Sequence, residues 1–167
     1  MYTSVDGFVK DYEHECGETQ KVFAALTDKS LAQAVANDHR TLGRIAWHLV
    51  TTYPEMCGLA GIPFSGVGKD DPVPKSAAEI AAAYQKVSQQ TLEHIQKNWK
   101  DPTLAEVKNF YGMDWPMGLA LQILVQHEIH HRGQMTVLMR QAGLNVPGVY
   151  GPSRDEWTAI GMQPPTV

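Results

Sequence analysis

Apolar side chains recur at intervals of three and four residues along most of this chain, which is the period of a helix with one buried face. The first such stretch follows Ser4, a residue type that often caps the start of a helix, and continues to about Thr27. The second covers about residues 41–59. Pro54 within it predicts a kink near Thr52, because proline cannot donate the backbone hydrogen bond of a helix interior.

Two further helical stretches follow. Residues 76–79 (Ser-Ala-Ala-Glu) have the sequence of a capping box, which predicts the start of the third helix. The fourth covers about residues 117–142, between Pro116, which suits a first helical turn, and Gly143, which suits a helix end. A loop then leads to a short helix that Ser153 is expected to cap.

Few strand signals interrupt the helices. Residues 104–115 alternate weakly around Gly112, which predicts irregular structure with a small hairpin. The Gly/Pro/Asp-rich residues 58–74 form a loop and not a linker between domains, because neither flank could bury a core alone. We therefore expect an all-α fold in which residues 1–167 form one domain. It is a four-helix bundle of up-down or crossover connection, with a short extra helix at the C-terminus.

Composition and charge narrow the function classes. The 167 residues are 43% hydrophobic, which is enough for one sizeable core, and a net charge of −4 argues against nucleic-acid partners. No stretch approaches eighteen apolar residues, and the first residues do not have the pattern of a secretory signal, so we expect a cytoplasmic protein without a membrane partner. Cys16 and Cys57 form no CxxC motif and predict no disulfide framework.

The fourth helix carries two histidines with the spacing of a chelating pair. At about 100° per residue, one stripe of this helix contains Ala120, Ile123, Leu124, His127, His131, Gln134 and Leu138. His127 and His131 therefore project side by side from an apolar face, where leaving an imidazole without a partner costs about 1–3 kcal/mol. The pattern fits two hydrogen-bonded core histidines or two ligands of one metal ion.

A third ligand would have to come from another helix. His14 lies opposite the apolar stripe of the first helix and is expected at the surface. His39 precedes the second helix, while His48 and His94 lie at the margins of the apolar stripes of the second and third helices. Periodicity alone does not choose between them.

Three segments of the chain resemble the DinB-like (YfiT-like) family of four-helix-bundle metalloproteins. Residues 44–50 are similar to the segment that holds the family's second-helix histidine, and residues 127–134 are similar to its histidine-rich segment ending in His-Arg-Gly-Gln. Residues 143–148 resemble its Gly-Leu-x-x-Pro-Gly ending. The likeness extends over nearly the whole chain. It implies that the metal ligands are His48, His127 and His131.

The resemblance also implies a kind of chemistry. Three imidazoles without a fourth protein ligand leave an open metal site, which suits catalysis better than a structural role. Zinc fits nitrogen ligands, and nickel is the alternative. Related bundles include thiol-dependent S-transferases and a thiol-dependent maleylpyruvate isomerase. The expected function is therefore transfer of a low-molecular-weight thiol cosubstrate to a small-molecule electrophile, in detoxification or stress response.

The family resemblance further implies self-association, since its members often form dimers through helix faces. We accordingly expect a homodimer. The sequence itself offers only aromatic residues that would be exposed on the predicted helices, such as Trp47 and Trp157. The same two side chains could instead cover loops.

Two residues are candidates for a catalytic or supporting role beside the histidines. Gln134 lies one turn further along the same stripe and either orients a ligand or lies at the end of the bundle. Glu55 follows His48 by seven residues and could act as a base on the same face, although Pro54 disturbs that projection. Arg132 is expected to pair with a carboxylate.

Two alternative functions stay open at this point. Residues 127–131 also satisfy the H-E-x-x-H signature of zinc proteases, with Glu128 as the base and Glu156 as a distant candidate for the third ligand. Against it, Gln134 stands where the extended metzincin form has glycine, and Glu128 is rotated by about 100° from His127, a direction that could simply face solvent. The other alternative is a non-catalytic stress or ligand-binding protein that the metal stabilises.

Overall fold

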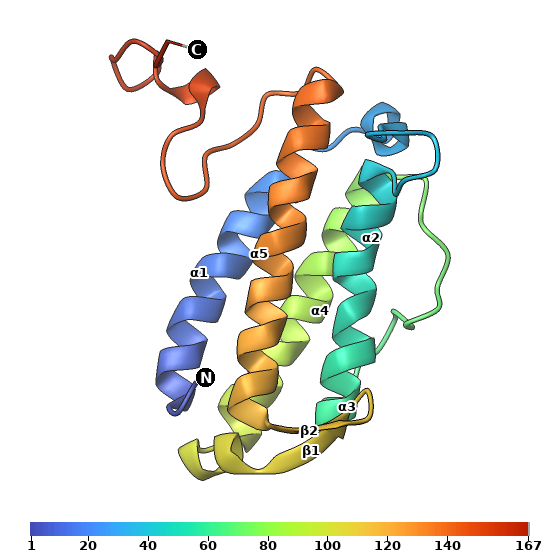
Figure 1. Cartoon of the computed structure of the whole chain (residues 1–167), viewed down its shortest axis with the longest axis vertical. Helices are drawn as coiled ribbons and strands as arrows, with labels where there is room; N and C mark the ends of the chain where they lie inside the picture. Colours follow the sequence, from blue (N-terminus) through green and yellow to red (C-terminus); the bar gives the residue numbers. More distant parts are fainter. Residues whose placement is uncertain (167) are drawn as a thin grey trace.

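Four long helices pack into one bundle in the computed structural model, which describes residues 1–166 (Figure 1). They are α1 (Val5–Ala24), α2 (Leu42–Thr52), α4 (Ala77–Asn98) and α5 (Met117–Gln141). The side-chain oxygens of Ser4, Thr41 and Ser76 each accept a backbone hydrogen bond at the start of α1, α2 and α4. The predicted all-α four-helix bundle is confirmed.

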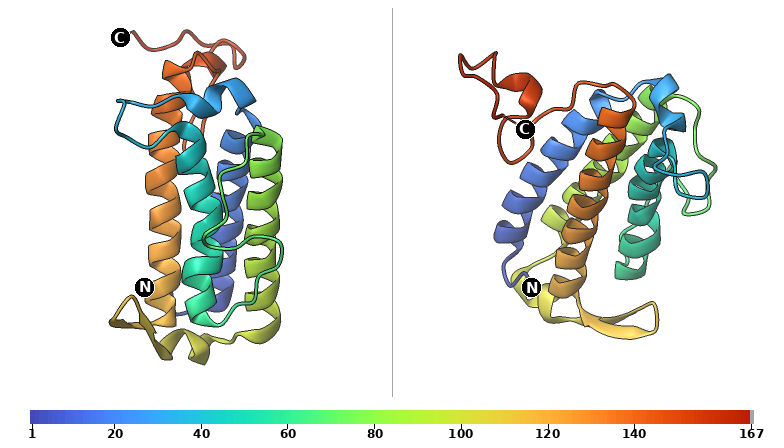
Figure 2. Two further views of the ribbon diagram at one scale, coloured as in Figure 1. Left: turned by 90° about the vertical axis from the view of Figure 1, so that its right-hand side faces the viewer. Right: turned by 45° about the horizontal axis from the view of Figure 1, so that its top comes forward.

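The order of the helices around the bundle follows from their contacts. α1 packs against α4 and α5, and α2 packs against the same two helices, so that α1 and α2 lie diagonally opposite. α1 and α5 run in one direction, whereas α2 and α4 both run in the other (Figures 1 and 2). The loop of residues 61–76 therefore carries the chain back along the whole bundle. Of the two connection types that the sequence left open, up-down and crossover, the structure has the crossover type.

The kink expected at Pro54 appears as a change of helix type. α2 ends at Thr52, and the chain continues in a wider π-helical turn, η2 (Tyr53–Cys57), and in one α-helical turn, α3 (Gly58–Ala60). Pro54 lies in the first turn of η2, where its missing N–H and its ring disturb the regular hydrogen-bond ladder. Side chains beyond Thr52 therefore do not keep the register of α2.

A small hairpin closes one end of the bundle. The 3₁₀ turn η3 (Asp101–Ala105) leads into β1 (Val107–Phe110), which pairs antiparallel with β2 (Met113–Pro116). Tyr111 and Gly112 connect the strands with φ angles of 56° and 85°, the left-handed conformation that a tight two-residue turn requires. The predicted hairpin around Gly112 is present.

The other end of the bundle holds the 3₁₀ helix η1 (Asp28–Ala32) and the C-terminal tail (Figure 1). In the tail, a single 3₁₀ turn, η4 (Arg154–Glu156), follows Ser153, so the expected C-terminal helix is shorter than predicted. Of the two roles open for Trp47, exposure at the surface or cover of a loop, the structure shows the second. Trp47 is 4% exposed, and its Nε1 donates to the backbone oxygen of Asp71, 2.7 Å away, in the crossover loop. Within residues 1–166, no helix is long and apolar enough to cross a membrane.

Candidate metal centre

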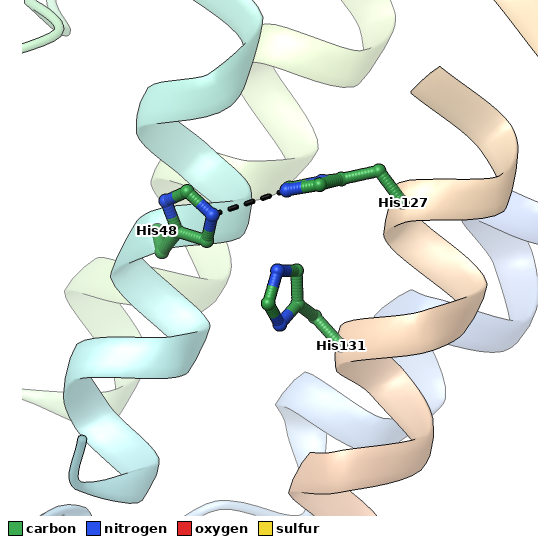
Figure 3. Close-up of side chains that lie close together, drawn as sticks. All are labelled: His48, His127 and His131. Carbon is green, nitrogen blue, oxygen red and sulfur yellow. Dashed lines mark hydrogen bonds between the residues drawn. The ribbon is translucent and has the colours of Figure 1, made fainter. Parts of the chain in front are cut away.

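Three histidines meet between α2 and α5 (Figure 3). His48 projects from α2, and His127 and His131 project from successive turns of α5. Nε2 of His48 lies 3.1 Å from Nε2 of His127, and one ring nitrogen from each of the three residues lies within 4.8 Å of the others. Periodicity left His39, His48 and His94 open as partners of the α5 pair, the family resemblance implied His48, and the structure places His48 beside the pair.

The second nitrogen of His131 is held by Gln134. Nδ1 of His131 lies 2.7 Å from Oε1 of Gln134, and an amide oxygen can only accept, so this Nδ1 carries the proton. The amide nitrogen of Gln134 lies 3.1 Å from Nε2 of His130, which accepts from it in the same orientation. Nε2 of His131 is consequently left with its lone pair, in the form that binds a metal.

Burial keeps these imidazoles neutral. The pKa of His48 and that of His127 are lowered to about 4 by partial burial and, next, by the charge that the other histidines would carry. Burial also lowers the pKa of His131, whereas the hydrogen bond that His131 donates to Gln134 acts in the opposite direction and raises it. All three rings are thus neutral at neutral pH, and each offers the lone pair of one ring nitrogen.

The spacing of the rings suits a common ligand. Two nitrogens bound to one tetrahedral zinc ion at 2.0–2.1 Å lie about 3.3–3.4 Å apart, and the Nε2 atoms of His48 and His127 are close to this spacing at 3.1 Å. Nδ1 of His127 is buried and has no hydrogen-bond partner among the described residues. The residues present therefore fit a divalent metal ion with nitrogen ligands.

Comparison with known proteins adds the family. A family model described as the DinB family matches residues 1–165. The chain belongs to the DinB family. This DinB-family protein is 45% identical over 165 residues to the uncharacterized protein YrdA of Bacillus subtilis (strain 168). The match covers 99% of both chains.

Two solved structures are similar to this DinB-family protein. The crystal structure of a DinB-like protein from Bacillus cereus ATCC 10987 superposes with a TM-score of 0.86 at 48% identity, over 90% of this chain and 100% of that chain. A DinB-like protein of Bacillus subtilis, YjoA, has a TM-score of 0.67 at 17% identity, over 86% of this chain and 97% of that chain. The second likeness concerns the fold alone.

Glu55 is not part of the histidine cluster of this DinB-family protein. It lies in η2, beyond the end of α2, and therefore no longer shares the face of His48. Its carboxylate lies near Tyr111 in the hairpin turn. Partial burial, first, and the charge of Glu55, second, raise the pKa of that tyrosine to about 12. The structure thus places the Glu55 side chain near the hairpin and outside the histidine cluster, and its role as a base stays a prediction.

Glu128 lies in the core and not in solvent. It is 2% exposed, and its carboxylate accepts hydrogen bonds from Thr19 at 2.6 Å, Tyr84 at 2.5 Å and Tyr53 at 2.7 Å. Burial is the first cause that raises the pKa of Tyr53 and of Tyr84 well above the usual value, so both phenols stay protonated and donate. The carboxylate is fully hydrogen-bonded in the core and does not lie beside the histidines as a base.

Arg132 continues this buried polar network toward the tail. Its guanidinium donates to the carboxylate of Glu15 at 2.6 Å, to the hydroxyl of Thr19 at 3.0 Å and to the phenol of Tyr150 at 2.8 Å. The predicted carboxylate partner of Arg132 is therefore present. Neither Glu128 nor Arg132 is available to substrate, and both hold α5 against α1 so that His127 and His131 face α2.

Sequence reasoning missed one residue beside the cluster. Arg40, in the loop before α2, lies close enough for its positive charge to contribute to the lowered pKa of His48, His127 and His131. Its position in a loop has no periodicity from which a facing direction could be read. The helix start at Thr41 was the one signal that could have directed attention to the residue immediately before it.

Proposed function

We propose that this DinB-family protein binds one divalent metal ion, zinc before nickel, through His48, His127 and His131. The observation that carries the proposal is that three neutral imidazoles from two helices lie together. The Nε2 atoms of His48 and His127 are 3.1 Å apart. Histidine nitrogens favour zinc and nickel over calcium or magnesium, which prefer oxygen ligands. Three protein ligands leave room for a further ligand.

We further propose that the site serves a thiol-dependent transfer reaction. A bound metal ion of this kind lowers the pKa of a coordinated thiol or water. The protein's own thiols do not suit the role of nucleophile: burial, as the first cause, raises the pKa of Cys16 and that of Cys57 to about 12. A low-molecular-weight thiol cosubstrate would supply the nucleophile instead.

The chain's own residues would prepare the site for this chemistry. Partial burial keeps the imidazoles neutral, and Gln134 fixes the tautomer and ring orientation of His131. The three rings are only half-buried, which leaves them accessible to a small molecule from outside. The protease alternative loses support, because Glu128 is bonded to three hydroxyl groups in the core.

Metal content tests the first part of the proposal. We expect about one equivalent of zinc per chain in the purified wild type and its loss in His48→Ala and in His131→Ala, measured by mass spectrometry. His14→Ala is the matched control, because His14 is an exposed histidine of α1 outside the cluster. Metal retained in both cluster variants would contradict the proposal.

Turnover tests the second part. The zinc-loaded protein is incubated with common bacterial thiols and a chlorinated aromatic electrophile, and thioether formation is followed. We expect a rate above that of the metal-free protein and above that of His48→Ala. Equal rates in all three samples would contradict the transferase function while leaving metal binding intact.

A further inference from the structure

A pocket of ≈ 380 Å³ opens directly beside the histidine cluster. One wall is the loop before α2, with Val35, His39 and Arg40, and the floor includes Ile45 of α2. The opposite wall is the second half of α5, with His131, Gln134, Val137 and Leu138. Since His131 belongs to both the pocket and the cluster, a molecule that fills the pocket touches one of the proposed metal ligands.

The polar part of the pocket is cationic. Arg40 is exposed and forms no ion pair within residues 1–166, although Asp38 lies two positions away and pairs with His39 at 2.7 Å. Among residues 1–166, the pocket lining includes no Asp or Glu side chain. Arg44 does not line the pocket but adds a second positive charge near His48, whose pKa it helps to lower. An unpaired guanidinium in such surroundings favours an anionic partner, and its planar donors fit a carboxylate.

The remaining lining is aliphatic. Val35 and Val137 are 61% and 53% exposed and flank the opening, while Ile45 and Leu138 are buried beneath them. Branched apolar side chains at the rim and the floor would be covered by a hydrocarbon group, which gains about 25 cal/mol per Å² of apolar surface removed from water. The volume lies within the range of small-molecule sites.

We propose that this pocket binds a small carboxylate with an aliphatic body and that Arg40 selects for the charge. The carboxylate pairs with the guanidinium of Arg40, and the hydrocarbon part lies against Ile45, Val137 and Leu138. The proposal rests on the proposed function in one respect: such a ligand would be held beside the metal as the substrate. Binding of the carboxylate itself does not require the metal, because Arg40 and the aliphatic walls belong to the protein.

The test compares a charged probe with a neutral probe of the same body. Hexanoate and hexan-1-ol are titrated into the full-length protein, and ¹H–¹⁵N NMR shifts give both the affinity and the location. We expect hexanoate to shift the amides of residues 35–45 and 131–138 and to bind about tenfold more tightly than hexan-1-ol, the worth of one charge-assisted hydrogen bond.

Variants then assign the selectivity. Arg40→Gln is expected to weaken hexanoate about tenfold and to leave hexan-1-ol unchanged, whereas Arg40→Lys retains part of the preference. Arg140→Gln, at an exposed arginine near the end of α5, is the matched control and should leave both affinities unchanged. Equal affinity for the two probes, or an Arg40→Gln variant that binds hexanoate like the wild type, would overturn the proposal.

The same titration with and without zinc separates this inference from the proposed function. If zinc does not bind but hexanoate binds with its dependence on Arg40, the metal proposal fails and the carboxylate pocket stands. If zinc binds and hexanoate binds only in its presence and independently of Arg40, the metal holds the carboxylate, and the assignment to Arg40 is overturned.

Discussion

At the scale of single residues, the candidate metal centre depends on how the second nitrogen of each imidazole is used. Nδ1 of His131 donates to Gln134, whereas Nδ1 of His127 has no partner in the described structure. A hydrogen bond at that nitrogen fixes the ring and raises the basicity of the other nitrogen. His131 is therefore the better oriented of the two proposed ligands on α5.

Replacing the acceptor of His131 should weaken metal binding. We expect Gln134→Leu to lower zinc affinity about tenfold or more, and Gln134→Glu to restore it, because a carboxylate also accepts from Nδ1. Competition with a chromophoric chelator measures both. Gln141→Leu, at an exposed glutamine of the same helix, is the control and should bind like the wild type. Unchanged affinity in Gln134→Leu would mean that the hydrogen bond to Gln134 does not support metal binding by His131.

The histidines should also make the metal-free protein sensitive to acid. The pKa of His48 and that of His127 are about 4 in the folded chain, below the value of about 6.5 expected after unfolding. Between these values the unfolded chain binds more protons, so stability falls as the pH falls from 6.5 toward 4. Urea unfolding at pH 7 and pH 5 should show a smaller loss in the His48→Ala/His127→Ala double variant than in the wild type. An equal loss would assign the acid sensitivity to other groups.

At the scale of elements, α5 presents two different polar faces on one helix. His127 and His131 face α2 and are half-buried, whereas Glu128 and Arg132, each one residue further along, point into the core. The hydroxyl of Thr19 joins the two core residues by accepting from Arg132 and donating to Glu128. α5 is thus held at a fixed rotation, and the direction of the two histidines follows from it.

Loss of this core carboxylate should be costly. Glu128→Leu leaves the hydroxyls of Thr19, Tyr53 and Tyr84 without their acceptor, and we expect the free energy of unfolding to fall by about 3 kcal/mol or more. Urea unfolding measures this, and Glu13→Leu on the exposed face of α1 is the control. The folded fraction of Glu128→Leu should still bind zinc. Normal stability with loss of metal would instead support a catalytic or ligand role for Glu128.

The sequence predicted where the helices begin and end better than which face of each helix is buried. Ser4, Thr41 and Ser76 marked helix starts correctly because a cap is a local interaction between neighbouring residues. The stripe through His127 and His131 included the buried Ala120, Leu124 and Leu138 but not Glu128 and Arg132, which are buried as well. A periodicity that counts charged residues as exposed cannot find a core carboxylate whose partners lie on three other elements.

The candidate site shows the same division. The pair at His127 and His131 could be read from spacing within one helix, but its partner His48 needed the resemblance to a family, since it lies 79 residues away from His127. Glu55 was expected on the face of His48 because the period of α2 was extended across Pro54, where the π-helical turn η2 interrupts it. Arg40 has a loop position, so only the folded structure places it beside the cluster.

At the scale of the whole molecule, the core and the histidine cluster are separate. The core consists of buried apolar residues from all four long helices, while the three histidines lie half-buried between two of them. The bundle therefore has a source of stability that does not include a metal. This separation favours a site kept for binding or reaction over one that staples the fold.

Removal of the metal should leave the bundle folded. After chelation we expect an unchanged helical circular dichroism spectrum at 25 °C and a melting temperature lowered by several degrees, since a ligand at one hundred times its Kd adds about 2.7 kcal/mol. Thermal unfolding with and without added zinc measures both. Collapse of the helical signal on chelation would favour the alternative of a metal that only stabilises the protein.

The C-terminal tail is attached to the bundle through Tyr150. Its phenol lies 2.8 Å from the Glu15 carboxylate and accepts from Arg132. Tyr150→Phe should free the tail and accelerate tryptic cleavage at the exposed Arg154 about tenfold, with little change in the unfolding of the bundle. Tyr111→Phe in the hairpin turn is the control. An unchanged cleavage rate would show that other contacts hold the tail.

The crossover loop sets a minimum length for this part of the chain. Because α2 and α4 run in the same direction, the sixteen residues between Ala60 and Ala77 must return along a bundle whose helix α4, of 22 residues, is about 33 Å long. A fully extended chain covers about 3.3 Å per residue, so about ten residues suffice for the return. The loop is therefore about six residues longer than this minimum. Deletions beyond that number would force a different threading of the four helices, so this segment tolerates changes of sequence far better than loss of length.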